Sequence, residues 1–283
     1  MTSRSAGERN RRYKLATQLA NGGRDPFAHH GYVNTPVYHA STLLYPSAQE
    51  FLAHRGRYSY GRRGTPTSEA LETALAGLEG PQCEAVALLP SGLAAISVAL
   101  LSVVRAGDHV LVTDSAYGPT RRFCDDILPR YGVTAAYYDP AVGAGIAALM
   151  RPNTTAVFVE SPGSLSFEVQ DVPAIAAAAH ARNAAVLMDN TWATPVYFRA
   201  LENGVDLSIQ SGTKYIGGHS DVMIGAVASV SATAARLKET VYGMGLCVGP
   251  DDMNLALRGL RTMGVRLAQH QASGLKVARW LQA

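Results

Sequence analysis

The chain has 283 residues, of which 47% are apolar and 17% charged, and its formal net charge is +3. This composition excludes a disordered protein, and the balance of charges excludes one that binds nucleic acids or membrane surfaces through a basic patch. The three cysteines are widely spaced and match neither a disulfide framework nor a metal-binding motif, which indicates free thiols in a reducing, cytoplasmic compartment.

Residues 1–66 contain many Gly and Pro turn signals and are predicted to form an extended, loop-like arm. The N-terminal end of this arm lacks the apolar segment of a secretory signal, so we expect a solvated tail there. The arm ends in a basic, aromatic, glycine-containing stretch that includes Tyr60 and Arg62. Taken alone, such a stretch is more often a surface loop than a binding element.

Between residues 67 and 250, short apolar strands alternate with helical patterns. This alternation predicts an α/β domain with a mostly parallel central sheet and helices on both faces. The predicted strands are Val86–Leu89, His109–Thr113, Thr134–Tyr138, Ala156–Glu160, Val186–Asp189, Leu207–Gln210 and Met223–Ser229. The predicted helices begin at Thr67 or span Leu93–Val104, Val172–Ala181 and Thr233–Met244.

A last long helix is predicted over residues 251–283, and apolar residues continue along it to its end. A domain seldom ends within an apolar helical stripe. We therefore expect a further C-terminal domain that this chain does not contain.

Two polar motifs follow predicted strands, at the edge where functional groups of such sheets gather. Ser91, Gly92 and Leu93 begin a helix, where free backbone N–H groups and the helix dipole attract an anion. Asp189 ends an apolar strand, where a carboxylate needs a partner. For each motif a structural helix cap is the alternative interpretation.

Lys214 follows another predicted strand, between two hydroxyl-bearing residues (Ser211 and Thr213) and an uncharged segment. It is one of four lysines, and the other three lie in the tail or among charged helix residues. If an amine nucleophile acts in this protein, Lys214 is the candidate.

Together these motifs fit one chemistry. A lysine amine forms a Schiff base with an aldehyde cofactor. An aspartate on the ring nitrogen keeps pyridoxal phosphate an effective electron sink, and a helix start with an arginine binds its phosphate. Tyr117, which follows the predicted strand His109–Thr113, is placed to stack on the ring.

From about residue 31 to residue 283, the sequence resembles the Cys/Met-metabolism family of pyridoxal-phosphate enzymes, in the fold-type I, aspartate aminotransferase-like class. The stretches that carry this resemblance are YGRRGTPT (60–67), DNTW (189–192), SIQSGTKY (208–215), GHSDVMIG (218–225) and GLRTMGVRL (259–267). Within the family, YGRRGTPT, DNTW and ESPGS (160–164) are similar to the cystathionine β-lyases, whereas γ-lyases and γ-synthases typically show Thr-Asn-Pro after the corresponding glutamate.

The resemblance implies a role for each candidate residue. Lys214 carries the cofactor and then removes the substrate's α-proton, Asp189 pairs with the pyridine nitrogen, and Tyr117 stacks on the ring. The phosphate is held by Ser91, Gly92, Leu93, Ser211 and Thr213. Tyr60 and Arg62 reach the phosphate of a neighbouring subunit's cofactor, which implies a homo-oligomer, a tetramer built from dimers. Lys214, Tyr117 and Tyr60 are the implied catalytic residues, and no metal is expected.

The implied reaction is the β-elimination of L-cystathionine to homocysteine, pyruvate and ammonia, a step of methionine biosynthesis. The alternatives are a γ-lyase, a γ-synthase, a lyase of other cysteine conjugates, and a cofactor-binding protein without turnover. The last alternative arises because the family carries the arginine for the substrate carboxylate in the C-terminal domain. A nicotinamide-dependent dehydrogenase is disfavoured because no Gly-x-Gly-x-x-Gly motif follows the first predicted strand.

Overall fold

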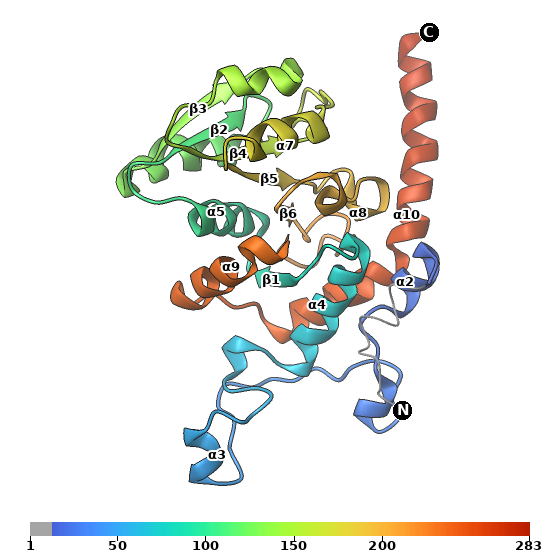
Figure 1. Ribbon diagram of the computed structural model, residues 1–283. Coiled ribbons are helices and arrows are strands. Elements are labelled where there is room, and N and C mark those ends of the chain that lie inside the picture. Colours follow the sequence, from blue (N-terminus) through green and yellow to red (C-terminus); the bar gives the residue numbers. More distant parts are fainter. Residues whose placement is uncertain (1–12) are drawn as a thin grey trace.

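The computed structural model describes residues 13–283 and has a central sheet of seven strands in the order β1-β7-β6-β5-β4-β2-β3 (Figure 1). The first twelve residues of the predicted arm lie outside the described residues. The strands are β1 (Ala85–Leu89), β2 (His109–Thr113), β3 (Thr134–Tyr138), β4 (Thr154–Glu160), β5 (Ala185–Asp189), β6 (Leu207–Gln210) and β7 (Gly225–Ser229).

The sheet is mostly parallel, as the alternation of strands and helices predicts. Strands β3, β2, β4, β5 and β6 pair in parallel, and β7 lies antiparallel between β6 and β1. The seventh strand begins at Gly225 rather than at Met223. Ile224 is held away from the strand because its N–H donates to the Thr213 hydroxyl at 3.1 Å and its carbonyl accepts the Thr213 N–H at 3.0 Å.

Helices cover both faces of the sheet, which confirms the predicted fold class. The α-helices are α2 (Leu15–Asn21), α3 (Ala48–Leu52), α4 (Pro66–Glu79), α5 (Gly92–Val103), α6 (Gly118–Arg122), α7 (Val172–His180), α8 (Thr194–Tyr197), α9 (Ser231–Gly243) and α10 (Pro250–Gln282). The 3₁₀ or π segments are η1 (Pro26–His29), η2 (Gly61–Arg63), η3 (Phe123–Ile127), η4 (Leu128–Tyr131), η5 (Pro140–Ala148) and η6 (Ala200–Asn203).

The core follows from the alternation of side chains along the strands. In β1, Ala87 and Leu89 point to the face that α5 and α9 cover, whereas Val86 and Leu88 point to the face covered by α4 and α10. Farther along the second face, α7 packs on β4 and β5. Both faces of the inner strands are therefore buried, as a parallel sheet requires, whereas the edge strand β3 is partly exposed.

The arm is less loop-like than its sequence predicts. Helix α2 forms because Leu19, which is 4% exposed, is buried against α4 and α10. At the other end of the chain, α10 packs on the body as far as Leu267, and residues 268–283 are exposed along a helix that extends away from the sheet (Figure 1). None of the helices in residues 13–283 combines the length and apolar character that a bilayer crossing requires.

Candidate active site

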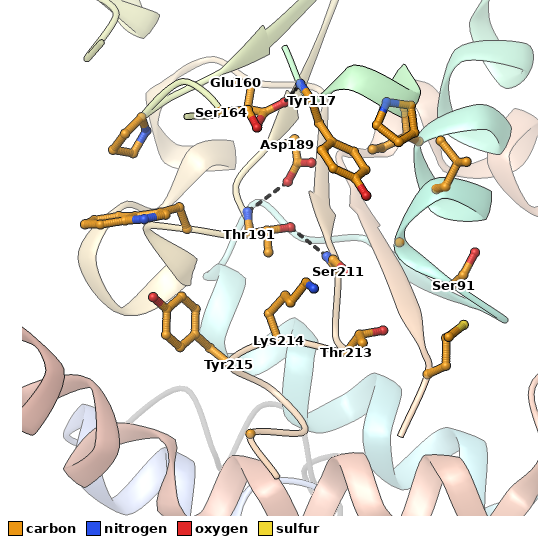
Figure 2. Close-up of a pocket in the computed structure, with 18 of the residues that line it drawn as sticks. Ser91, Tyr117, Glu160, Ser164, Asp189, Thr191, Ser211, Thr213, Lys214 and Tyr215 are labelled. Carbon is orange, nitrogen blue, oxygen red and sulfur yellow. Dashed lines mark hydrogen bonds between the residues drawn. The ribbon is translucent and has the colours of Figure 1, made fainter. Parts of the chain in front are cut away.

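The carboxyl ends of β4, β5 and β6 and the start of α5 surround a pocket with a volume of about 1200 Å³ (Figure 2). Most of the candidate residues were predicted to lie at this edge, because parallel strands bring their carboxyl ends together. The predicted site residues that line the pocket are Ser91, Gly92, Leu93, Tyr117, Asp189, Ser211, Thr213 and Lys214.

One wall of the pocket is the start of α5. Ser91 caps the helix, because its Oγ accepts the N–H of Ala94 at 3.1 Å. The N–H groups of Gly92 and Leu93 have no acceptor among residues 13–283. A Cβ on Gly92 would lie 2.4 Å from the Oγ of Ser211, so only glycine lets the helix start approach Ser211 this closely. The free N–H groups, the helix dipole and the two hydroxyls form a site for an anion.

Asp189 provides a buried acid on a second wall. It is 9% exposed, and its Oδ1 accepts the N–H of Thr191 at 3.0 Å. The hydroxyl of Thr191 in turn accepts the N–H of Ser211 at 2.7 Å, which ties the acid to the anion site. Burial raises the pKa of Asp189, and the bonds from Thr191 oppose that rise. A cation against this carboxylate would stabilise its charged form.

Glu160 lies beside Asp189 and was not among the predicted site residues. The two residues end adjacent parallel strands in register. Burial, and then the charge of Asp189, raise the pKa of Glu160 to about 8. Near neutrality Glu160 is therefore mostly protonated. The available signal was that Glu160, like Asp189, is an acid directly after an apolar strand.

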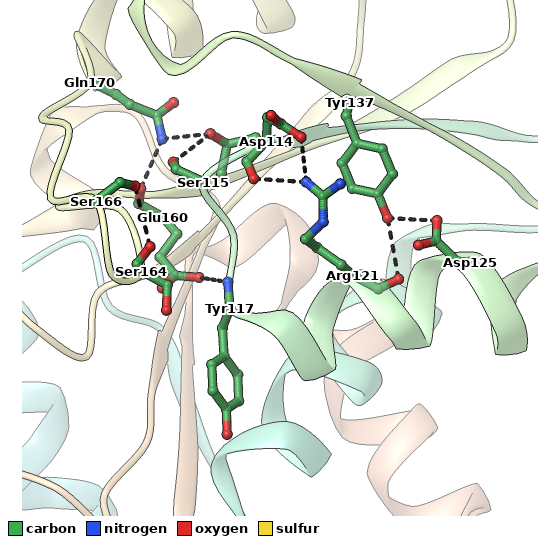
Figure 3. A network of polar contacts seen from close by, with 11 residues as sticks. Asp114, Ser115, Tyr117, Arg121, Asp125, Tyr137, Glu160, Ser164, Ser166 and Gln170 are labelled. Carbon is green, nitrogen blue, oxygen red and sulfur yellow. Dashed lines mark hydrogen bonds and ion pairs between the residues drawn. The ribbon is translucent and has the colours of Figure 1, made fainter.

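Tyr117 projects its ring into the pocket from a loop that is fixed on several sides (Figures 2 and 3). Its N–H donates to Oε2 of Glu160 at 2.8 Å. Upstream, Asp114 forms an ion pair with Arg121, whose guanidinium lies 3.9 Å from the ring centroid of Tyr137. These contacts hold the backbone of the loop while the Tyr117 ring, 46% exposed, stays open to the pocket.

Lys214 lies in a turn after β6, and Figure 2 shows its side chain extending into the pocket near Ser211 and Thr213, with Asp189 and Tyr117 across from it. The turn is stabilised by backbone bonds from the Lys214 N–H to the Ser211 carbonyl at 3.0 Å and from the Gly218 N–H to the Lys214 carbonyl at 2.8 Å. The Thr213 hydroxyl is bonded to the Ile224 backbone, so it also braces the turn.

Tyr60 and Arg62 are the predicted site residues that do not line this pocket in the described part of the chain. Tyr60 pairs with Thr42 in an isolated β-bridge, and Arg62 donates to the carbonyl of Tyr242 at 3.0 Å. Their predicted role toward a neighbouring subunit remains a prediction.

The structure adds two aromatic residues to the pocket that had no assigned role. Trp192 and Phe167 line it and contact each other edge to face, with ring centroids 6.2 Å apart. Trp192 belongs to the motif that begins with Asp189, so its position beside the site could have been predicted from the sequence. Phe167 lies in a loop whose path no local pattern predicts.

The pocket's donors fit pyridoxal phosphate. The anion site suits its phosphate, Asp189 suits the protonated ring nitrogen, and Lys214 is the only lysine that lines the pocket within residues 13–283. Within the same residues, no group of three or more His, Cys, Asp or Glu side chains is placed to hold a metal ion.

Comparisons with known proteins agree with this fit. The family of Cys/Met metabolism PLP-dependent enzymes matches residues 16–283. A Rhizobium johnstonii protein with the provisional name cystathionine β-lyase is 53% identical, over 95% of this chain and 67% of its own length. Cystathionine β-lyase MetC of Escherichia coli is 46% identical, over 95% of this chain and 69% of its own length.

The matches also include other activities and a solved structure. An L-alanine/L-glutamate racemase of Wolbachia pipientis is 37% identical, over 93% of this chain and 68% of its own length. The crystal structure of MetB from Corynebacterium glutamicum superimposes with a TM-score of 0.91 at 32% identity, covering 96% of this chain and 70% of that one. The chain therefore belongs to the Cys/Met-metabolism family of pyridoxal-phosphate-dependent enzymes.

Proposed function

We propose that this chain forms the cofactor-binding part of a carbon–sulfur lyase that converts L-cystathionine to homocysteine, pyruvate and ammonia. The observation that carries the proposal is that one pocket brings Lys214 together with the buried acid Asp189 and the anion site at the start of α5. The names of the relatives that are 46% and 53% identical favour the β-lyase over the other reactions of the family.

In the proposed reaction, each residue acts on a different part of the bound molecules. Pyridoxal phosphate supplies an electron sink for the bond that breaks at the substrate's α-carbon. Lys214 would hold the cofactor through its Nζ and, as a free amine, would take the α-proton. Asp189 would stabilise a positive charge on the ring nitrogen, and Tyr117 would support the ring face. Ser91, Gly92, Leu93, Ser211 and Thr213 retain the phosphate.

The arm completes the proposed site in an oligomer. Tyr60 and Arg62 lie outside their own chain's pocket, so in this proposal they serve the pocket of a second copy. The homotetramer that we propose would contain such pairs of pockets. A single chain would then bind the cofactor more weakly than the assembly does.

The first experiment asks where the cofactor binds. The chain is incubated with pyridoxal 5′-phosphate, reduced with borohydride and digested, and the modified peptide is identified by mass spectrometry. We expect modification at Lys214, and Lys214→Ala should lose both the modification and any turnover. Modification at another lysine, or turnover by Lys214→Ala, would contradict the proposal.

The second experiment separates the reactions. Pyruvate from L-cystathionine indicates β-elimination, whereas 2-oxobutanoate indicates γ-elimination. The racemase among the relatives makes interconversion of L- and D-alanine the third assay. If Lys214 is modified but none of these products forms, the chain binds the cofactor without turnover.

A further inference from the structure

The motif GLRTMGVRL remains without a role in the proposed function, although it lies on α10 beside the turn that carries Lys214. The backbone of α10 approaches this turn closely. A Cβ on Gly259 would lie 2.2 Å from the carbonyl oxygens of both Ile216 and Gly217. Helix and turn can therefore touch here only because residue 259 is glycine.

Arg266, two turns farther along α10, forms hydrogen bonds with the same turn. Its Nη2 donates to the carbonyl of Tyr215 at 2.8 Å and to the carbonyl of Gly259 at 2.9 Å. Its Nε donates to the Thr262 hydroxyl at 3.1 Å, which fixes the guanidinium on the helix. The Tyr215 carbonyl accepts none of the turn's own backbone bonds within residues 13–283, so Arg266 binds the acceptor next to Lys214 that the turn leaves open.

Gly218 is a second residue of the turn that lies close to Arg266. A Cβ there would lie 2.3 Å from Cζ of Arg266, and the residue has a φ of +79°, which only glycine adopts at little cost. The N–H of Gly218 donates to the carbonyl of Lys214 at 2.8 Å. The guanidinium thus binds the turn at Tyr215, next to Lys214, and lies close to Gly218, whose N–H closes the turn.

We propose that Arg266 is a positioning residue for Lys214: it fixes the backbone of the Lys214–Gly218 turn from α10 and so sets where the amine lies in the pocket. This inference rests on the proposed function of Lys214. It predicts that loss of the guanidinium leaves the fold intact and allows the amine to adopt positions from which it captures the cofactor slowly.

The same helix provides a matched control in Arg261. Its Nη1 donates to the carbonyls of Ala20 at 3.1 Å and Gly22 at 2.8 Å, at the end of α2. Arg261 therefore also binds backbone carbonyls from α10, yet it does not line the pocket within the described residues. Loss of Arg261 should affect stability without affecting the Lys214 turn.

The test compares Arg266→Gln, Arg266→Lys, Arg266→Met and Arg261→Gln in the full chain. Hydrogen exchange without cofactor reports whether the Gly217 and Gly218 amides are protected. Borohydride trapping of pyridoxal 5′-phosphate over time gives the capture rate at Lys214. We expect Arg266→Gln and Arg266→Met to capture the cofactor roughly tenfold more slowly and to exchange these amides faster, because charge-assisted hydrogen bonds to the turn are lost.

Arg266→Lys keeps a charged donor and should recover part of the rate, whereas Arg261→Gln should stay within about twofold of the wild type. Capture and exchange at wild-type rates in Arg266→Gln would overturn the inference, and so would an equal defect in Arg261→Gln or equal recovery by Arg266→Met. If the wild-type chain is not modified at Lys214, the proposed function fails. The exchange of the turn amides then still decides whether Arg266 holds the turn.

Discussion

The edge of the sheet around Asp189 and the arm loop around Arg62 were both predicted to bind the cofactor. Of these two regions, only the sheet edge lines the pocket in the part of the chain that the structure describes. The sheet-edge residues meet in one pocket because β4, β5 and β6 end together. The arm loop is held outside that pocket by contacts with α4 and α9. The fold of one chain thus brings the sheet-edge residues together, whereas in our proposal the arm loop acts in a second copy.

The arm loop is fixed to the body by its own contacts. Tyr58 donates to the carboxylate of Glu69 on α4, and Arg57 pairs with the same carboxylate at 2.6 Å. On α9, Tyr242 accepts a bond from Arg62 at 3.0 Å. These contacts hold the loop in a defined position on its own chain.

The largest expected effect tests the sheet edge. Asp189→Asn keeps the size of the side chain but removes the charge opposite the proposed ring nitrogen, and we expect turnover to fall by about 100-fold or more. The measurement is the initial rate of pyruvate formation at saturating pyridoxal 5′-phosphate.

The control is Asp206→Asn, at the opposite edge of the sheet, where the carboxylate accepts the Val186 N–H at 2.7 Å and contacts His180. This variant should lower the melting temperature and leave the specific activity of the folded protein unchanged. Equal losses of activity in both variants would mean that Asp189 serves the fold rather than the chemistry.

The next prediction concerns which chain's pocket the arm loop serves. If Arg62 acts on a neighbouring pocket, Arg62→Ala and Lys214→Ala are each defective, but a mixed dimer contains one pocket with both residues intact. Mixing and reassembling the two variants should then restore about a quarter of the wild-type activity, because half of the dimers are mixed and each has one good pocket. No recovery, with mixed dimers demonstrated by mass, would mean that Arg62 acts on the pocket of its own chain.

Much of the sheet edge was predictable because its signals are local. A strand that ends in an acid, a Ser-Gly helix start and a lysine between hydroxyls are visible in short windows, and the parallel sheet brings them together. The bounds of β2, β3 and β6 coincide with the predicted strands for the same reason. The cofactor followed from the chemistry of the assembled residues and from the family resemblance.

The remaining features depend on contacts between distant segments, which no window contains. Glu160 gains its raised pKa from burial and from Asp189, a register partner 29 residues away in the sequence. Helix α2 exists because Leu19 packs against α4 and α10. Met223 leaves β7 because Thr213 binds Ile224, so the error in that strand boundary comes from a tertiary contact.

A moderate effect concerns the acid pair and pH. Burial raises the pKa of Glu160 to about 8, well above the usual carboxyl value of about 4.3. The folded chain therefore holds a proton that the unfolded chain releases, and this contribution to stability is full at low pH and is lost as the pH rises toward about 8. Glu160→Gln, which keeps an acceptor for Tyr117, should reduce that loss by on the order of 2 kcal/mol.

The measurement is the free energy of unfolding by urea, without cofactor, at several pH values between about 5 and about 8. Glu79→Gln is the matched comparison, because burial raises the pKa of Glu79 to about 7 at the end of α4, where it accepts a bond from Ser208. The loss of stability that Glu79 causes should be complete at a lower pH than the loss that Glu160 causes. Identical pH profiles for the wild type and Glu160→Gln would refute the raised pKa of Glu160.

The smallest effect concerns how the arm loop is held. Tyr58→Phe removes the hydroxyl that donates to Glu69 while Arg57 keeps its ion pair, so the chain should lose roughly 1 kcal/mol of stability. Tyr45→Phe, in the same arm, is the control, because its ring contact with Phe51 survives the change.

Since the loop serves another pocket in our proposal, Tyr58→Phe should not slow cofactor capture by the isolated chain, but it should weaken the recovery of activity on mixing. If capture slows in a chain kept monomeric by dilution, the arm acts on its own pocket, and the division between the two regions is wrong.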